Sequence, residues 1–394
     1  MRPDPLSFLS AEIDALKQQG LYRTLRILEG EAAAHATFDR RSVVNLSSNN
    51  YLGLATHPKL KEAALDAVRR YGVGSGAVRS ISGTMEMHME LERRLAAFKR
   101  VEAVVVFQSG FAANAGTVAA VLSKEDVVIS DELNHASIID GCRLSRAGIK
   151  VFPHKDVDAA RKILKELPSS QRKLLITDGV FSMEGDLGPL PGLCAAAEEY
   201  GAIMMVDDAH ASGVFGTNGS GTVDHFGCHG RVDIQVGTLS KAVGVLGGYV
   251  AGSRTLIDWL YHRARPFLFS TSHPPAVTAA CIAALDVLET EPQWVEQLWT
   301  NTRFFKSGLE ALGFNTGVSE SPITPVIVGE AATAAKMSDL LFERGVFAQS
   351  IGFPTVARDK ARLRTIVAAT HTREDLQFAL DRFADVGREL GVIG

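Results

Sequence analysis

The chain has 394 residues, 46% hydrophobic and 22% charged, which is the composition of an ordinary globular protein with room for a large core and a second, smaller lobe. A net charge of −4 argues against nucleic acid or an anionic membrane as the main partner. The four cysteines are scattered without a CxxC pair, which suits a reducing cytoplasm. His225, Cys228 and His229 lie close together but lack the second ligand pair of a structural zinc site, so no metal is expected.

The N-terminal part of the chain predicts three helices. Residues 1–20 have the pattern of an amphipathic helix and lack the apolar core of a signal peptide. The stretches 59–72 and 88–100 have helical periodicity with charge on one face.

The uncharged stretch 103–123 is long enough to span a bilayer. Gln108, Ser109 and Gly110 interrupt it, however, and a strand, a tight turn and a helix explain it better. We therefore expect no transmembrane segment here.

Short apolar runs rich in β-branched residues then alternate with helical patterns. They are 102–107, 126–131, 173–179, 202–208, 233–238 and 247–252. This alternation predicts a mainly parallel sheet covered on both faces, with its chemistry beyond the carboxyl ends of the strands. Polar clusters follow those ends: QSGF, SDELNHAS, TDGVFSMEGD, DDAH and TLSK.

From about residue 290 the pattern changes to a helix, short strands and a closing helix. We therefore predict an N-terminal arm (1–45), a large domain (46–289) and a small α+β C-terminal domain (290–394).

One lysine stands out in the stretch TLSKAVGVLGGYVAGS, because Lys241 is the only charged residue between Asp233 and Arg254. Lysine usually keeps its ammonium in water. Lys241 therefore either leaves the end of its strand for solvent, or is a Schiff-base lysine whose pKa is lowered by burial. The local sequence leaves both interpretations open.

The other clusters are ambiguous when taken one at a time. The turn at Ser109 and Gly110 could bind an anion or be only a turn, Asp207 could pair with a cation or cap the next element, and His135 could be structural. In chain order, the turn, His135, Asp207 and Lys241 match the needs of pyridoxal 5′-phosphate: a phosphate cradle, a ring stacker, a partner for the pyridinium nitrogen and an imine-forming amine.

The chain also resembles the α-oxoamine synthases from about residue 20 to the C-terminus. The motifs that carry the resemblance are SNNYLGLA (48–55), GSGAVRSISGT (74–84), HMELERRLAAF (88–98), SDELNHASIIDG (130–141), TDGVFSMEGD (177–186), VDDAHASGVFG (206–216), GTLSKAVGVLGGYVAG (237–252), RPFLFSTS (265–272) and ARLRTIVAATHT (361–372). The resemblance implies an α/β fold-type I pyridoxal-phosphate transferase, with an N-terminal arm and a smaller α+β C-terminal domain. Such an enzyme condenses a small amino acid with an acyl-CoA.

The resemblance also implies the catalytic residues. Lys241 would form the imine with the cofactor and later act as the base, while Asp207 would keep the pyridinium nitrogen protonated. His135 would stack on the ring, and His210 and Ser182 would lie near its phenolic oxygen.

The residues implied for the phosphate are Ser109, Gly110, Phe111 and Thr238, together with Ser270 and Thr271. The last two would reach it from the neighbouring subunit, which implies a homodimer with shared active sites. Asn49 and Arg364 would hold the substrate α-carboxylate, a role that suits the planar guanidinium fork.

The chain resembles two members of the family in particular. The wording of SDELNHASIIDG and SNNYLGLA favours glycine C-acetyltransferase, which joins glycine to acetyl-CoA. The alternative is 8-amino-7-oxononanoate synthase, which joins L-alanine to pimeloyl-CoA in biotin biosynthesis, or one enzyme with both activities. Arg23 could neutralise the distal pimeloyl carboxylate, or be an exposed arginine at a helix end. An aminotransferase or lyase, and a scaffold without activity, are the other hypotheses.

Overall fold

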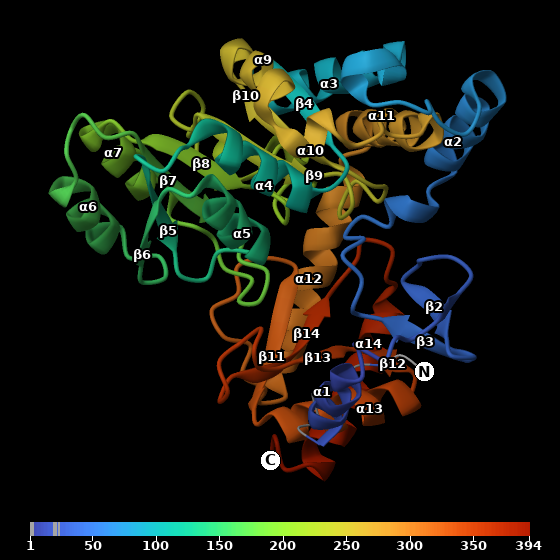
Figure 1. Ribbon diagram of the computed structural model, residues 1–394. Helices are drawn as coiled ribbons and strands as arrows, with labels where there is room; N and C mark the ends of the chain where they lie inside the picture. Colours follow the sequence, from blue (N-terminus) through green and yellow to red (C-terminus); the bar gives the residue numbers. More distant parts are fainter. Residues whose placement is uncertain (1–3, 19–21, 23) are drawn as a thin grey trace.

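The computed structural model describes residues 4–18, 22 and 24–394. Its centre is a seven-stranded sheet in the order β4-β10-β9-β8-β7-β5-β6 (Figure 1). The strands are β4 (Ala103–Phe107), β5 (Val127–Asp131), β6 (Gly148–Phe152), β7 (Lys173–Asp178), β8 (Ile203–Asp207), β9 (Ile234–Thr238) and β10 (Gly248–Gly252). Only β10 runs antiparallel to its neighbours, so the predicted mainly parallel sheet is confirmed.

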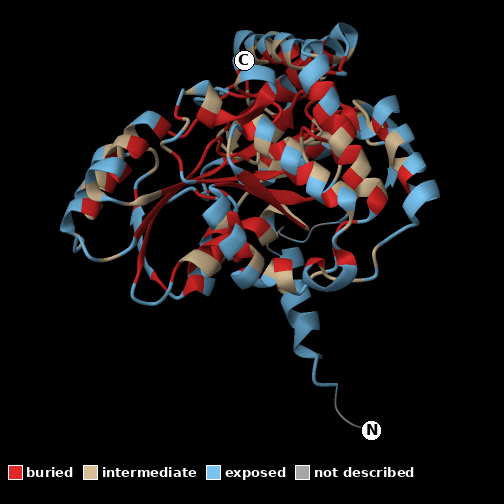
Figure 2. Ribbon diagram, turned by 90° about the horizontal axis from the view of Figure 1, so that it is seen from above, coloured by how far each residue is buried: buried red, intermediate tan, exposed pale blue. Residues whose placement is uncertain are grey.

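Helices cover both faces of this sheet. One face packs against α4 (Gly110–Val121), α5 (Ala136–Ser145), α9 (Arg254–Arg263) and α10 (Arg265–Leu268). The other face packs against α6 (Val157–Glu166) and α7 (Leu190–Tyr200) at one end, and against α3 (Glu86–Lys99) and α11 (Pro275–Thr290) at the other. Figure 2 shows the buried strands between helices whose outer surfaces are exposed. Both faces are apolar because both are covered, and the strands therefore read as continuous apolar runs.

The predicted helices are also present. α2 (Pro58–Tyr71) and α3 match the two charged helical stretches, and α1 (Phe8–Gln18) matches the amphipathic one. The stretch 103–123 folds as β4, a turn and α4, as predicted. Within the described ranges, no helix is both long and apolar enough to cross a membrane.

The C-terminal part contains α12 (Gln293–Ala311), β11 (Ile323–Gly329), α13 (Ala331–Glu343), β12 (Val346–Phe347), β13 (Gln349–Ile351), β14 (Ala361–Ile366) and α14 (Arg373–Glu389). Its three-stranded sheet has the order β11-β14-β13. A second sheet joins β12 to β1 (Leu28–Glu29), β2 (His35–Phe38) and β3 (Arg41–Asn45) of the N-terminal part. Val44 and Leu46 thereby enter the core of the C-terminal part. The domain boundaries at 45/46 and 289/290 remain a proposal.

Candidate active site

Lys241 lies in the tight turn between β9 and β10. The turn is closed by hydrogen bonds from Gly244 N–H to the Lys241 carbonyl (2.9 Å) and from Thr238 Oγ1 to the Gly247 carbonyl (2.8 Å). Gly244 has φ +77°, and a Cβ there would lie 2.5 Å from the backbone nitrogen of Ala55. The small residues after the lysine therefore let this turn pack closely against the segment before α2.

The amine of Lys241 is held away from water. Burial lowers its pKa to about 8; the negative charge of Asp207 opposes this shift and the positive charge of Arg364 adds to it. Among the residues that the structure describes, none forms an ion pair with the amine. About one molecule in ten then carries a neutral amine at pH 7, against fewer than one in a thousand for an ordinary lysine. The geometry favours the Schiff-base interpretation over the solvent-exposed one.

Asp207 and His135 are connected by a buried polar network. Asp207 ends β8, and its carboxylate accepts hydrogen bonds from Asn114 Nδ2 (2.6 Å) and from the N–H of Ala209 (2.9 Å). Asn114 Nδ2 also reaches Ser137 Oγ (2.9 Å), which lies 2.8 Å from His135 Nδ1. One amide group therefore fixes both the carboxylate and the imidazole.

Sequence reasoning did not find Asn114. The signal was present, because this residue follows Gly110 by four positions and so lies on the same face of α4 as the proposed anion-binding turn. It is also a buried amide in a helix that carries no charged residue.

Asp178, at the end of β7, was also missed. It is buried, accepts the His135 backbone N–H (2.8 Å) and donates its own N–H to Asn134 Oδ1 (2.9 Å). Burial, and then the nearby charge of Asp207, raise the pKa of Asp178 well above its usual range. The carboxyl group of Asp178 is thus driven toward its neutral form.

Arg364 lies on β14 of the C-terminal part, and its side chain is largely withdrawn from water. Its Nε donates to the Ser182 carbonyl (2.5 Å) and its Nη1 donates to Asn49 Oδ1 (3.2 Å). The structure thus brings together three of the predicted residues from distant parts of the chain. Arg362, two positions away, pairs instead with Glu184 (3.1 Å).

His210 is buried, and its Nδ1 lies 2.7 Å from the hydroxyl of Tyr51. Burial, and then the positive charges of Lys241 and Arg364, lower the pKa of His210 well below its usual range. The imidazole is therefore neutral at pH 7 and forms its hydrogen bond with Tyr51 in that state. Tyr51 is a further site residue that sequence reasoning missed, although it lies within the motif SNNYLGLA.

The turn between β4 and α4 supplies donors for an anion. Ser109 caps α4 by accepting the Ala112 N–H at its Oγ (3.1 Å), and Gly110 and Phe111 begin the helix. N–H groups of a first helical turn have no acceptor within the helix and lie at its positive end. Thr238 packs beside this turn: a Cβ added to Gly110 would lie 3.4 Å from the Cβ of Thr238.

Ser270 and Thr271 follow α10, and the Thr271 carbonyl accepts a hydrogen bond from Gln108 Nε2 (2.8 Å). Because Gln108 immediately precedes Ser109, this bond holds the loop with Ser270 and Thr271 close to the start of α4 in the same chain. Their predicted reach into a neighbouring subunit remains a prediction. Arg23 lies outside the described residues.

These groups fit pyridoxal 5′-phosphate. The start of α4 and Thr238 suit a phosphate, Asp207 suits a protonated ring nitrogen, and His135 presents an exposed imidazole beside them. Lys241 offers an amine of lowered pKa for covalent attachment.

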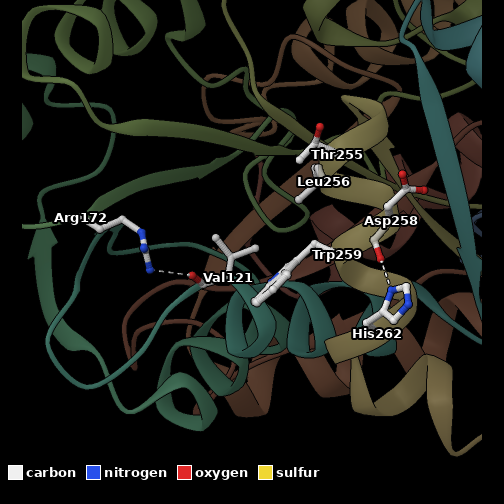
Figure 3. Close-up of a pocket in the computed structure, with 7 residues that line it drawn as sticks. All are labelled: Val121, Arg172, Thr255, Leu256, Asp258, Trp259 and His262. Atoms are coloured by element: carbon white, nitrogen blue, oxygen red, sulfur yellow. Dashed lines mark hydrogen bonds between the residues drawn. The ribbon is translucent and has the colours of Figure 1, made fainter.

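Two further observations concern parts of the structure that contain none of the predicted site residues. Across residues 4–18, 22 and 24–394, no group of three or more His, Cys, Asp or Glu side chains is arranged to hold a metal ion, and His229 bonds Asp224 instead (2.9 Å). A shallow hollow of about 570 Å³ lies between α9 and the end of α4 (Figure 3). Its lining residues are Val121, Arg172, Thr255, Leu256, Asp258, Trp259 and His262.

The sheet and the residues at the carboxyl ends of its strands define a fold-type I pyridoxal-phosphate enzyme. Residues 41–383 match the family model described as aminotransferase class I and II. The chain is 60% identical over 387 residues to an 8-amino-7-oxononanoate synthase of Symbiobacterium thermophilum, covering 98% of this chain and 99% of the relative. It is 57% identical over 389 residues to one of Thermoanaerobacter pseudethanolicus, covering 98% of each.

Among solved structures, a serine palmitoyltransferase from S. paucimobilis with a bound pyridoxal-phosphate adduct is similar with a TM-score of 0.94. The two chains share 33% identity, over 99% of this chain and 100% of that one. The chain therefore belongs to the aminotransferase class I and II family, and within it to the α-oxoamine synthases, which are pyridoxal-phosphate-dependent acyltransferases.

These relatives correct the order of the two candidate reactions. They favour the alternative, 8-amino-7-oxononanoate synthase, and do not support glycine C-acetyltransferase or a role in threonine degradation. The motifs used to choose between the two supply His135, Asn49 and Tyr51. Those residues belong to the proposed cofactor and amino-acid site, so they carry little information about the length of the acyl chain.

Proposed function

We propose that this enzyme is an 8-amino-7-oxononanoate synthase, which condenses L-alanine with pimeloyl-CoA and releases CoA and CO2. The observation that carries the proposal is 60% identity across 98% of the chain to a relative of that name. The site is compatible with the reaction, because an amine of lowered pKa, a partly buried arginine and a helix N-terminus that suits an anion lie in the same region.

Each residue then has a chemical task. Arg364 and Asn49 hold the alanine carboxylate and so orient the Cα–H bond toward Lys241, whose neutral amine removes that proton. Asp207 stabilises positive charge at the ring nitrogen and His135 limits the tilt of the ring. When bound, the cofactor supplies the electron sink for the Cα electron pair.

The condensation exchanges one carbon–sulfur bond for one carbon–carbon bond. A bond forms between alanine Cα and the thioester carbonyl carbon of pimeloyl-CoA, and the C–S bond breaks. The thiolate takes up a proton to give free CoA. The α-carboxylate of the former alanine leaves as CO2, and a proton replaces it on carbon.

We also propose that the enzyme is a cytoplasmic homodimer. The proposal is supported by exposed apolar side chains, among them Ile81 (83% exposed) and Phe269 (70% exposed), on two segments that the Val78–Thr271 bridge joins. α1 likewise exposes Phe8. A second copy of the chain would cover such surfaces. Light scattering after size-exclusion chromatography tests this, and a monomer at micromolar concentration would contradict it.

The decisive experiment measures thiol release by the purified holoenzyme. Glycine or L-alanine is combined with acetyl-CoA or pimeloyl-CoA, in all four pairs, and the products are identified by mass. The proposal requires the highest kcat/KM with L-alanine and pimeloyl-CoA and a decarboxylated product. A higher kcat/KM with glycine and acetyl-CoA would overturn it, and amino transfer without thiol release would reject the acyltransferase reaction itself.

A further inference from the structure

His154 lies between two buried carboxylates outside the catalytic residues. It follows β6; its Nδ1 is 3.1 Å from Asp131 Oδ1 and its Nε2 is 3.0 Å from Asp186 Oδ2. A carboxylate oxygen only accepts, so each ring nitrogen must carry a proton for both bonds to form. The geometry therefore requires an imidazolium. Its ring also packs edge-on against Phe181, with the ring centres 4.4 Å apart.

The second carboxylate belongs to a compact loop. Asp186 lies in the segment 181–187, where the Phe181 N–H donates to the Asp186 carbonyl (3.0 Å) and the Gly185 N–H donates to the Phe181 carbonyl (2.8 Å). These bonds tie the two ends of the loop together. A group that fixes Asp186 therefore fixes the rest of the loop.

The same loop holds both arginines of β14. The Ser182 carbonyl accepts Arg364 Nε (2.5 Å), and the Met183 carbonyl accepts Arg362 Nη1 (3.0 Å). A path of direct contacts thus runs from His154 through Asp186 and the loop to the guanidinium of Arg364. The other carboxylate is held in place, because Asp131 ends β5, a fully buried strand that pairs with a neighbour on each side.

We propose that His154 is a positioning residue: its imidazolium ties the 181–187 loop to β5 and thereby aims Arg364 at the carboxylate of the amino-acid substrate. This inference rests on the proposed function, because it takes that carboxylate as the partner of Arg364. A loop that shifts by a fraction of an ångström misaligns the guanidinium, whose two-pronged recognition depends on orientation.

The charges around His154 favour the imidazolium. Asp131 and Asp186 contact the ring, Lys155 contacts Asp186 (3.0 Å), and Glu320 faces Lys155 (3.5 Å). The side chain of Glu132 accepts the His154 backbone N–H (2.9 Å). Burial lowers the pKa of His154, but its bonds to Asp131 and Asp186 outweigh this and raise the pKa to about 9. Below about pH 9 the His154 ring therefore donates hydrogen bonds to both Asp131 and Asp186, and above that pH it loses one of them.

The test measures the Kd of L-alanine for the holoenzyme without acyl-CoA, from the change in cofactor absorbance. At pH 7.5, His154→Gln is expected to raise this Kd about tenfold, because misalignment of a bound group by about 1 Å can cost up to a hundredfold. The ratio of variant to wild-type Kd should fall toward one by pH 10, where the wild-type ring is neutral as well. Ionisations common to the two proteins, such as that of the alanine amine, cancel in this ratio.

The matched control is His262→Gln. His262 lies on α9 beside the hollow of Figure 3, with its Nδ1 2.7 Å from the Asp258 carbonyl. This control should leave the Kd unchanged at every pH. A His154→Gln ratio that stays constant with pH indicates a merely structural role and overturns the inference, as does an unchanged Kd at pH 7.5.

Asp186→Asn provides a second route if His154→Gln does not fold. It keeps the imidazole but removes a negative charge beside it, which lowers the pKa of His154. As the pH is raised, alanine affinity should therefore begin to fall at a pH below 9. An unshifted profile would overturn the inference. If the wild-type holoenzyme itself neither binds L-alanine nor releases thiol with pimeloyl-CoA, the proposed function fails instead.

Discussion

Asn114 offers the sharpest test of how the site is held. Asn114→Leu keeps the branched shape of the buried side chain, with a small gain in volume, but removes the donor that reaches both Asp207 (2.6 Å) and Ser137 (2.9 Å). A hydrogen bond to a charged group contributes about 1.5–3 kcal/mol. At about 1.4 kcal/mol per factor of ten, loss of the bond to Asp207 should raise the Kd of pyridoxal phosphate about 10- to 150-fold.

The assay titrates apoenzyme with pyridoxal phosphate and follows the visible absorbance of the imine. Thr117→Val is the matched control, because Thr117 lies three residues further along α4, is equally buried, and its hydroxyl has no hydrogen-bond partner among the residues described. It should bind the cofactor as the wild type does. If Asn114→Leu folds, as judged by circular dichroism, and binds pyridoxal phosphate within twofold of the wild type, the reasoning about this network is refuted.

Three further changes test separate parts of the structure. Lys241→Ala should lose the imine absorbance and nearly all thiol release. In wild-type apoenzyme, the rate of cofactor binding should rise with pH with a midpoint near pH 8, since burial lowers the pKa of the Lys241 amine to about 8. A midpoint above pH 10 would contradict this. Arg364→Lys keeps the charge but not the fork, so it should raise KM for L-alanine at least tenfold with KM for pimeloyl-CoA unchanged, and equal rises would argue against carboxylate binding. Lys99→Met removes the ion-pair partner of the fully buried Asp208, 2.9 Å away, and should lower the free energy of unfolding in urea by about 3–5 kcal/mol. The double variant with Asp208→Asn should be less destabilised than the single one. A loss below 1 kcal/mol would refute the idea that Lys99 neutralises a buried charge.

The sheet was predictable because parallel strands covered on both faces are apolar throughout, and strands of that kind stand out from the helices between them. The strand that sequence reasoning missed, β6, shows the limit of this signal. It lies at the edge of the sheet, and four of its five residues are exposed. Its sequence, GIKVF, therefore lacks the apolar run that identified its neighbours.

The position of a candidate site residue was predictable where the residue follows a strand, and was not predictable where it depends on contacts with residues distant in sequence. Lys241 and Asp207 end strands or follow them directly, so their place at the edge of the sheet follows from topology. Asn114 and His154 act through contacts with residues 93 and 32 positions away in sequence. No spacing rule joins such pairs, and only the packed fold brings them together.

Electrostatics distinguish Lys241, which we propose as the base, from His154, which we propose as a positioning residue. Lys241 has lost water and lies near Arg364. Asp207 opposes the lowering of the Lys241 pKa without forming an ion pair with the amine, and the carboxyl of Asp178 is itself driven toward its neutral form by burial. His154 has lost water too, but two carboxylates contact its ring directly. Desolvation acts in the same direction on both groups, so the direct carboxylate contacts decide the outcome: a lysine that gives up its proton readily, and a histidine that keeps its own.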